Sequence, residues 1–462
     1  MTSVSTDTIA ELRERVTGRV ITADDSDYDA QRAIFRGGFD GHPLAIVRVA
    51  NAHDIAKVIR AAREADLPLS VRSGGHSSSG ASTNDGGLVI DLRDMAQIDI
   101  DEKSQTAWAE SGASAVAMTR AAWDKGLAIG FGDTGSVGIG GITLGGGIGY
   151  LTRKHGLTAD NLIAAELVTA DGQIVQVDEN TNPDLFWAIR GGGGNFGVAT
   201  RFRYQLQPLP HFTGGLMVLP ATAESVAQFM TIAANAPEEM GTIANVMPCP
   251  PLPFVPSEIH GQMVNFAIIG FAGTDHEAER ALAPIRALKP IADLVKPEPY
   301  PDMYPPEDES YKPKALDYTF FMDHVDVPTA QTIIDRLNAS DAALRAVQLR
   351  ALGGAMARVP EDATAFAHRK APILAVAVNF WEDEDDYPVR EAWLRTTVAA
   401  LDQGVPGAYV GFIREERGAR LNAAYPSATL DRLRDVKTKW DPDNVFRRNL
   451  NIPPRTDNAA SS

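Results

Sequence analysis

The sequence has a single cysteine, Cys249, among its 462 residues, so no internal disulfide bond can form. This excludes the small domains that depend on disulfide bonds and is typical of a reducing compartment. The sequence also lacks a basic start followed by an apolar run, and no uninterrupted apolar run approaches the roughly 20 residues of a membrane helix. We therefore expect a cytoplasmic protein without a signal peptide or membrane span.

Basic residues are scarce relative to acidic ones. The chain has 43 Lys and Arg against 60 Asp and Glu, which gives a formal net charge of −17. Such an acidic surface argues against nucleic acid and anionic membranes as partners. Charged residues make up 22% of the chain and hydrophobic residues 44%, an ordinary globular balance, and the length suits two or three domains.

Several nucleotide-binding and catalytic motifs are missing as well. The sequence has no P-loop, no paired-histidine metal motif and no G-x-S-x-G elbow, and we expect no metal site. Gly192, Gly194 and Gly197 match the spacing of the dinucleotide fingerprint. A predicted helix precedes them and a predicted strand follows, which is the reverse of the Rossmann order. The acidic run at 381–387 is typical of a solvated turn.

The predicted elements change in character along the chain. Strand, helix and strand alternate over 43–75, as in an α/β layer, and 161–177 predicts a hairpin with its turn at Asp171-Gly172. After about residue 208, strand-like runs at 262–271, 316–325, 346–352 and 372–381 alternate with helical runs at 275–288 and 328–341. This part predicts a second α/β or α+β domain with a mixed or antiparallel sheet.

One loop, "VRSGGHSSSG" at 71–80, holds a single histidine, His76, between a glycine pair and three serines. Backbone N–H groups in such a loop can cradle a pyrophosphate, here those of Arg72, Ser73, Gly74, Gly75 and Ser77. The imidazole beside them could then act as a nucleophile toward a bound cofactor. A turn whose histidine caps local carbonyl groups is the alternative, and the loop alone favours that alternative.

Four segments taken together change this balance: 70–92, 135–162, 182–198 and 436–454. In this order they resemble the berberine-bridge-enzyme-like branch of the vanillyl-alcohol-oxidase flavoproteins over nearly the whole chain. The resemblance implies an α+β fold with a two-part, PCMH-type FAD-binding domain at 1–207. A substrate domain at 208–414 would have a mostly antiparallel sheet backed by helices. The segment 415–462 would return and pack on the FAD domain.

The resemblance also implies a cofactor, FAD, attached covalently through its 8α-methyl group to His76. Four glycines of the glycine-dense run would pack against the pyrophosphate and the flavin ring: Gly138, Gly141, Gly146 and Gly147. Val198 would close over the adenine side, and Asn449 would approach the flavin from the C-terminal segment. Many members attach FAD a second time through a cysteine at the position of Thr134, so a single attachment is expected here.

The implied activity is that of an oxidase. Val137 fills the position that gates oxygen at the flavin in the family, and a small residue there goes with oxidases, although Val137 can also serve as a packing residue. The partners would be a small organic substrate and dioxygen, with the protein a monomer or homodimer. A flavoprotein that only binds its ligand, and a dehydrogenase with another electron acceptor, remain alternatives.

The expected catalytic residues depart from the family. Arg350 stands where relatives have Glu, Gln or Asn, and Gln348 lies on the same strand face. Tyr409 is the phenol that remains at a family position. It could act as a base whose pKa is lowered by Arg350, or it could be a hydrogen-bonded wall residue. Arg350 could instead bind a substrate carboxylate or pair with an acidic residue. Tyr318 and Met322 could line the pocket, but core packing is the expected use of both.

Overall fold

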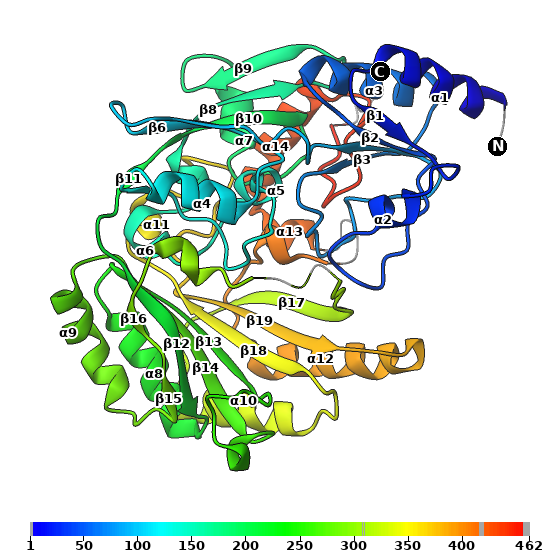
Figure 1. Cartoon of the computed structure of the whole chain (residues 1–462). Helices are drawn as coiled ribbons and strands as arrows, with labels where there is room; N and C mark the ends of the chain where they lie inside the picture. Colours follow the sequence, from blue (N-terminus) through cyan, green and yellow to red (C-terminus); the bar gives the residue numbers. More distant parts are fainter. Residues whose placement is uncertain (1–2, 307, 309, 415–419, 456–462) are drawn as a thin grey trace, which may run out of the picture.

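The computed structural model describes residues 3–306, 308, 310–414 and 420–455, and it has two lobes (Figure 1). The first lobe holds a four-stranded and a five-stranded sheet, and the second lobe holds an eight-stranded sheet. A small two-stranded pair, β7 (Leu127–Ala128) with β11 (Gln207–Pro208), lies where the chain leaves the first lobe. Residues 415–419 and 456–462, which begin and end the expected C-terminal return, lie outside the described residues.

The four-stranded sheet is the predicted α/β layer. Its order is β1 (Arg19–Ile21), β2 (Ala45–Arg48), β4 (Leu88–Asp91) and β3 (Leu69–Arg72), and β4 runs parallel to both β2 and β3. The crossover helix α3 (Ala52–Glu64) buries Ile55, Val58 and Ile59 at helical spacing. The prediction of strand, helix and strand is confirmed, and the loop with His76 begins directly after β3.

The five-stranded sheet is antiparallel throughout. Its strands, in spatial order, are β5 (Ile98–Asp101), β6 (Thr106–Glu110), β10 (Val198–Gln205), β8 (Leu162–Val168) and β9 (Ile174–Asp178). The hairpin β8–β9 turns at Asp171-Gly172, where Gly172 has φ +83°. Helix α7 (Pro183–Ala188) precedes the glycine loop at 191–197 and β10 follows it, so the exclusion of a Rossmann site is confirmed.

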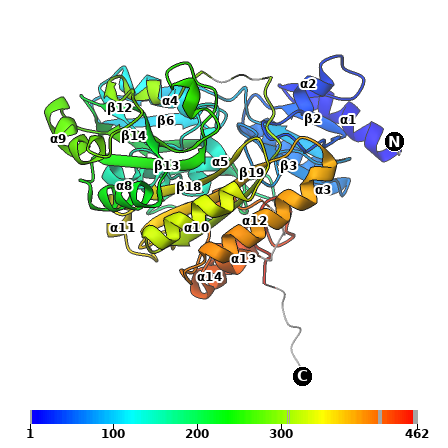
Figure 2. The same ribbon diagram turned by 90° about the horizontal axis from the view of Figure 1, so that it is seen from below.

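The eight-stranded sheet is antiparallel in every pair. Its strands are β12 (Thr213–Pro220), β13 (Met240–Pro248), β14 (Met263–Phe271), β15 (Ala292–Asp293), β16 (Lys296–Pro297), β17 (Ala315–Met322), β18 (Arg345–Ala351) and β19 (Ile373–Phe380). Four helices, α8 (Ala223–Asn235), α9 (Asp275–Arg286), α10 (Val327–Asn338) and α12 (Tyr387–Leu401), contribute buried residues to the core on one face (Figure 2). The predicted sheet backed by helices is confirmed, and its other face is turned toward the first lobe.

The two residues considered for the pocket, and the single cysteine, belong to cores. Met322 is buried on the helix-covered face of the sheet, and Tyr318 packs against the same core. The thiol of Cys249 is buried in a small cluster with Val218 and Val264. In the described part of the chain, no helix is both long and apolar enough to cross a membrane.

Buried polar contacts hold the two lobes together. Arg369, on the segment between β18 and β19, donates to both carboxylate oxygens of Asp160 at 2.7 and 2.8 Å. Arg153 donates to the carbonyl oxygens of Leu352 and Ala236 at 2.5 and 2.7 Å. Helix α14 (Ser427–Trp440) packs against α7 and joins the C-terminal segment to the first lobe.

His155, at the end of α6 (Thr152–His155), makes the protein sensitive to acid. Burial, and then the charge of Lys154, lower its pKa from 6.5 to about 4. Between these two values the unfolded chain binds a proton that the folded chain does not, so stability falls as the pH drops from 6.5 to 4. We expect the free energy of unfolding in urea to fall by about 2 kcal/mol more in the wild type than in His155→Gln between pH 7 and 4.5. Equal losses in the two proteins would contradict this.

Candidate functional site

A cavity of about 370 Å³ collects the four sequence segments in one place. Its lining includes most of the residues predicted for the cofactor and one predicted for catalysis: Ser73, Gly74, Gly75, His76, Ser77, Thr134, Val137, Gly138, Gly141, Val198, Asn449 and Tyr409. These residues come from the loop after β3, the glycine-dense run, the start of β10 and the C-terminal segment. Residues far apart in the sequence therefore share one cavity.

Three of the predicted cofactor-binding residues lie behind this lining. The guanidinium group of Arg72 is buried, where it donates to the carbonyl oxygens of Ser82 and Arg32 at 3.2 Å, and burial lowers its pKa to about 10. The side chain of Arg72 therefore supports the loop from below. Gly146 and Gly147 have φ +111° and +80°, and a Cβ atom on Gly147 would lie 2.1 Å from Thr158. They allow the chain to turn closely behind the cavity.

His76 is held between two partners. Its ring stacks on Phe35 with centroids 4.0 Å apart, and its Nε2 atom is 2.8 Å from the Oγ atom of Ser136. The two loops meet backbone to backbone, because a Cβ atom on Gly74 would lie 2.2 Å from the nitrogen of Gly138. This contact fixes the distance between the imidazole and the Ser136 hydroxyl.

Ser136 is missing from the residues predicted for the site, although a hydroxyl in an otherwise glycine-rich and apolar run is a usable signal. Phe35 offers no such signal, because it comes from an irregular segment far from both loops. Only the folded structure brings Phe35 to His76.

The cavity suits a flavin nucleotide, which combines a flat ring, a polyol and a pyrophosphate. A Cβ atom on Gly141 or Gly194 would meet no atom within 4 Å, so bare backbone faces the cavity there. The buried Oγ of Ser82 and Oδ1 of Asn449 have no hydrogen-bond partner within the described chain. Apolar side chains complete the wall: Leu69, Val71, Leu92, Val198 and Phe446. These unpartnered polar atoms can hydrogen-bond to the polar parts of FAD, and the apolar side chains can pack against its flat ring. The lining therefore fits FAD.

The C-terminal segment reaches the cavity through a buried ion pair. Lys437 is fully buried and donates to the carboxylate of Asp441 at 2.6 Å and to the carbonyl oxygen of Asn195 at 2.7 Å. Burial lowers the pKa of Lys437, although the negative charge of Asp441 partly raises it. Asn449 in turn donates to the carbonyl oxygen of Gly194 at 3.1 Å. The ammonium group thus fixes the cavity loop at 191–197 to the C-terminal segment.

The wall toward the second lobe carries an ion pair. Arg350 donates to Asp133 Oδ2 at 2.6 Å and, through Nε and Nη2, to the Oε1 of Gln348 at 2.9 and 2.7 Å. Gln348 donates to Asn245 Oδ1 at 2.9 Å, and the guanidinium group of Arg350 lies 5.3 Å from the ring centroid of Phe412. Asp133 and Phe412 line the cavity, whereas Arg350 and Gln348 stand directly behind them.

Tyr409 lines the cavity, but its phenol is not primed as a base. Burial raises its pKa, and the charge of Arg350 only partly opposes this effect. The charge of Arg350 lowers the pKa of Tyr409, as the sequence suggests, but complete burial of the phenol raises it by more, so the net shift is upward. Its oxygen accepts a hydrogen bond from the backbone nitrogen of Gly147 at 3.2 Å. At neutral pH Tyr409 is therefore a protonated wall residue.

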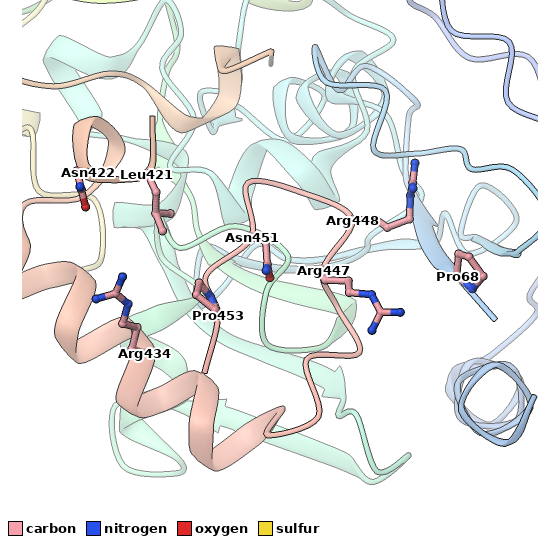
Figure 3. Close-up of a pocket in the computed structure, with 8 residues that line it drawn as sticks. All are labelled: Pro68, Leu421, Asn422, Arg434, Arg447, Arg448, Asn451 and Pro453. Carbon is pink, nitrogen blue, oxygen red and sulfur yellow. The ribbon is translucent and has the colours of Figure 1, made fainter. Parts of the chain in front are cut away.

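A second hollow, of about 580 Å³, lies beside the C-terminal segment (Figure 3). Its lining consists of Pro68, Leu421, Asn422, Arg434, Arg447, Arg448, Asn451 and Pro453. In Figure 3, Arg434 lies on one side of Asn451 and Pro453, and Arg447 and Arg448 lie on the other. The guanidinium groups do not converge on one point, so we place the candidate active site in the first cavity.

The fold and this cavity define a flavin-dependent oxidoreductase. Residues 43–178 match the family model described as "FAD binding domain", and residues 408–453 match "Berberine and berberine like". A FAD-linked oxidoreductase of Bacillus subtilis, YgaK, is 31% identical over 96% of this chain and 98% of its own. The (R)-6-hydroxynicotine oxidase of Paenarthrobacter nicotinovorans is 32% identical over 95% of this chain and 97% of its own.

Solved structures agree with these relatives. The crystal structure of 6-hydroxy-D-nicotine oxidase from Arthrobacter nicotinovorans covers 95% of this chain and 98% of its own, with 29% identity and a TM-score of 0.84. The chain belongs to the berberine-bridge-enzyme-like family of FAD-linked oxidoreductases. The predicted family, α+β fold class and FAD cofactor are confirmed.

Proposed function

We propose that the protein is an FAD-dependent oxidase of a small organic substrate, with one covalent attachment of the flavin to His76. The observation that carries this proposal is the cavity, in which His76, the glycine run and Asn449 meet. When bound, FAD would accept a hydride at N5 from a C–H bond next to nitrogen or oxygen and pass the electrons to dioxygen, which gives H₂O₂. The relative that oxidises 6-hydroxynicotine supports this reaction class.

We further propose a division of labour along the chain. Residues 1–207, with 415–462, would bind FAD, and residues 208–414 would cover the substrate. The contacts of Lys437 and Asn449 with the loop at 191–197 support the assignment of the C-terminal segment to the FAD domain. The ion pair between Asp133 and Arg350 supports a substrate site between the two lobes.

The residues of the site have separate tasks in this proposal. His76 holds the flavin, with its Nε2 engaged by Ser136. The bare backbone at Gly141 and Gly194 leaves room for the cofactor to approach. Val137 lines the cavity with a small side chain that lets dioxygen reach the ring. Thr134 stands at the second family attachment position and has no thiol, so one covalent link is formed.

A flavoprotein that binds a compound with little turnover is a second candidate. The protonated phenol of Tyr409 favours it, because the expected base is not available there. A dehydrogenase with another electron acceptor would differ from an oxidase only in the reaction of its reduced flavin with dioxygen.

Rapid mixing separates these functions. We expect at least one member of a panel of cyclic amines, benzylic alcohols and oligosaccharides to bleach the flavin anaerobically. Air-saturated buffer should then restore its absorbance within seconds. Val137→Leu should slow this reoxidation by about tenfold or more, a barrier increase of about 1.4 kcal/mol, without slowing the anaerobic reduction. Spectral perturbation without bleaching would establish the binding protein, and sluggish reoxidation of the wild type would establish the dehydrogenase.

A further inference from the structure

Asp133 is an acidic residue of the cavity wall, whose lining also includes Arg36 and Arg448. Among the described residues that line the cavity, it contributes the only carboxylate. It lies immediately before Thr134 in the glycine-dense run, on the first lobe, and 23% of its side chain is exposed. The Tyr150 hydroxyl donates to the backbone oxygen of Asp133 at 3.4 Å, so the residue is anchored while its carboxylate reaches the cavity wall.

The partner that sets the direction of this carboxylate comes from the second lobe. Arg350 on β18 donates to Oδ2 of Asp133, and Gln348 fixes the guanidinium group from the same strand face. Gln348 is itself fixed by Asn245 on β13, the strand paired with β18. Thr134 Oγ1 donates to the other carboxylate oxygen, Oδ1, at 3.4 Å. The shorter contact to Asp133 comes from the second-lobe sheet, although Asp133 belongs to the first lobe.

Arg350 is not available to bind a substrate anion. Only 4% of its side chain is exposed, and its donors are directed to Gln348, to Asp133 and to the carbonyl oxygen of Ile148 at 3.3 Å. Removing those partners would leave a buried charge without compensation, which is costly. The oxygens of Asp133 therefore form this part of the cavity wall, with the guanidinium group behind them.

We propose that Asp133 is the substrate-facing residue of this wall and that Arg350 is its positioning residue. The carboxylate accepts a hydrogen bond from an N–H or O–H group next to the C–H bond that is oxidised. The site then takes neutral or cationic donors, such as amines and alcohols, and disfavours anions. This inference rests on one part of the proposed function, namely that a flavin binds in the cavity. It does not require the covalent bond or the reaction with dioxygen.

Sulfite tests the charge of this wall without requiring the natural substrate. Its sulfur lone pair forms a bond to N5 of oxidised flavin, which bleaches the visible absorbance, so a titration of the holoenzyme yields a dissociation constant. Removing the negative charge in Asp133→Asn should tighten sulfite binding by about tenfold or more, because no carboxylate then offsets the nearby positive charge of Arg350. Arg350→Met should weaken it by a similar factor, because Asp133 is then uncompensated.

The opposite signs distinguish this role from a structural one. If the pair only held the lobes together, both variants would change sulfite affinity in the same direction. Asp302→Asn is the matched control, because it removes a carboxylate from an exposed ion pair with Arg120 and should leave the affinity unchanged. An affinity of Asp133→Asn within twofold of the wild type would overturn the inference even if Arg350→Met fails to fold. Failure of the oxidase proposal would appear separately, as sluggish reoxidation in air.

Discussion

Replacing His76 with alanine is expected to abolish the covalent bond between the polypeptide and its flavin. In the proposed linkage, a C–N bond would replace one C–H bond of the 8α-methyl group and one imidazole N–H bond. The two electrons and two protons released would go to dioxygen, which would become H₂O₂. Alanine offers no nitrogen, whereas the glycine loops and Asn449 remain to bind FAD without a covalent link.

Two measurements check this result. On an acid-denatured gel viewed under ultraviolet light, flavin fluorescence should migrate with the wild type and be absent from His76→Ala. Intact-mass spectrometry should show the added mass of FAD on the wild type alone. His42→Ala, in which an exposed histidine near the same lobe is removed, should keep both signals. A wild-type mass equal to that of its amino acids would contradict the covalent link.

A second prediction, of a partial effect on FAD attachment, concerns the hydroxyl of Ser136. A hydroxyl can accept a hydrogen bond from the imidazole N–H and can donate one once that proton has left, so it can assist the ring nitrogen before and after attachment. Ser136→Ala should slow attachment of FAD to the apoprotein by about tenfold, equivalent to about 1.4 kcal/mol in the barrier, whereas Ser136→Thr should retain most of the rate. The time course of the intact mass measures both.

Replacing Lys437 with methionine is expected to cost about 3–5 kcal/mol of folding free energy, because it breaks a fully buried ion pair. The carboxylate of Asp441 would remain buried, with the backbone nitrogens of Val445 and Phe446 still donating to it, at 2.8 and 2.9 Å. The carbonyl oxygen of Asn195 would also lose its donor at the cavity loop. Urea unfolding, followed in parallel by circular dichroism and tryptophan fluorescence, measures the loss.

The same helix provides the control. Lys439 pairs with Asp184 at 2.7 Å, but the Lys439 side chain is 59% exposed and that of Asp184 33%, so Lys439→Met should cost less than about 1 kcal/mol. The double variant Lys437→Met with Asp441→Asn should recover part of the loss, because it buries no charge and keeps an acceptor for the backbone nitrogens. Equal losses for Lys437→Met and Lys439→Met would show that the buried pair contributes nothing special.

Much of the architecture is predictable from local patterns. The alternation around β2, α3 and β3, and the Asp171-Gly172 hairpin, follow from hydrophobic periodicity and turn chemistry. The strands β12 and β13 are absent from the predicted runs. In β12 two glycines interrupt the pattern, and in β13 buried residues mix with polar ones. Their pairing with β14 supplies the order that their local sequence does not indicate.

The candidate site also combines features that are visible in the sequence with others that only the folded structure reveals. His76 and the glycine runs are visible in the sequence because tight backbone contacts demand glycine, and such runs are rare. The segment 441–444 forms a turn around Pro442, in which the backbone nitrogen of Asn444 donates to the carbonyl oxygen of Asp441. It is also a buried anchor, because the carboxylate of Asp441 accepts from Lys437 and from two backbone nitrogens. A short acidic turn looks alike whether it is solvated or buried, so its partners decide its role.

The sequence by itself determined the family, the FAD cofactor and the loop that carries His76, because these depend on residue types at short and fixed spacing. Only the tertiary structure decided which groups face the cavity. The partnership of Asp133 with Arg350 spans 217 positions along the chain, and that of Lys437 with Asn195 spans 242. The raised pKa of Tyr409 likewise comes from complete burial. Electrostatic roles depend on distance and desolvation in space, and neither is set by position in the sequence.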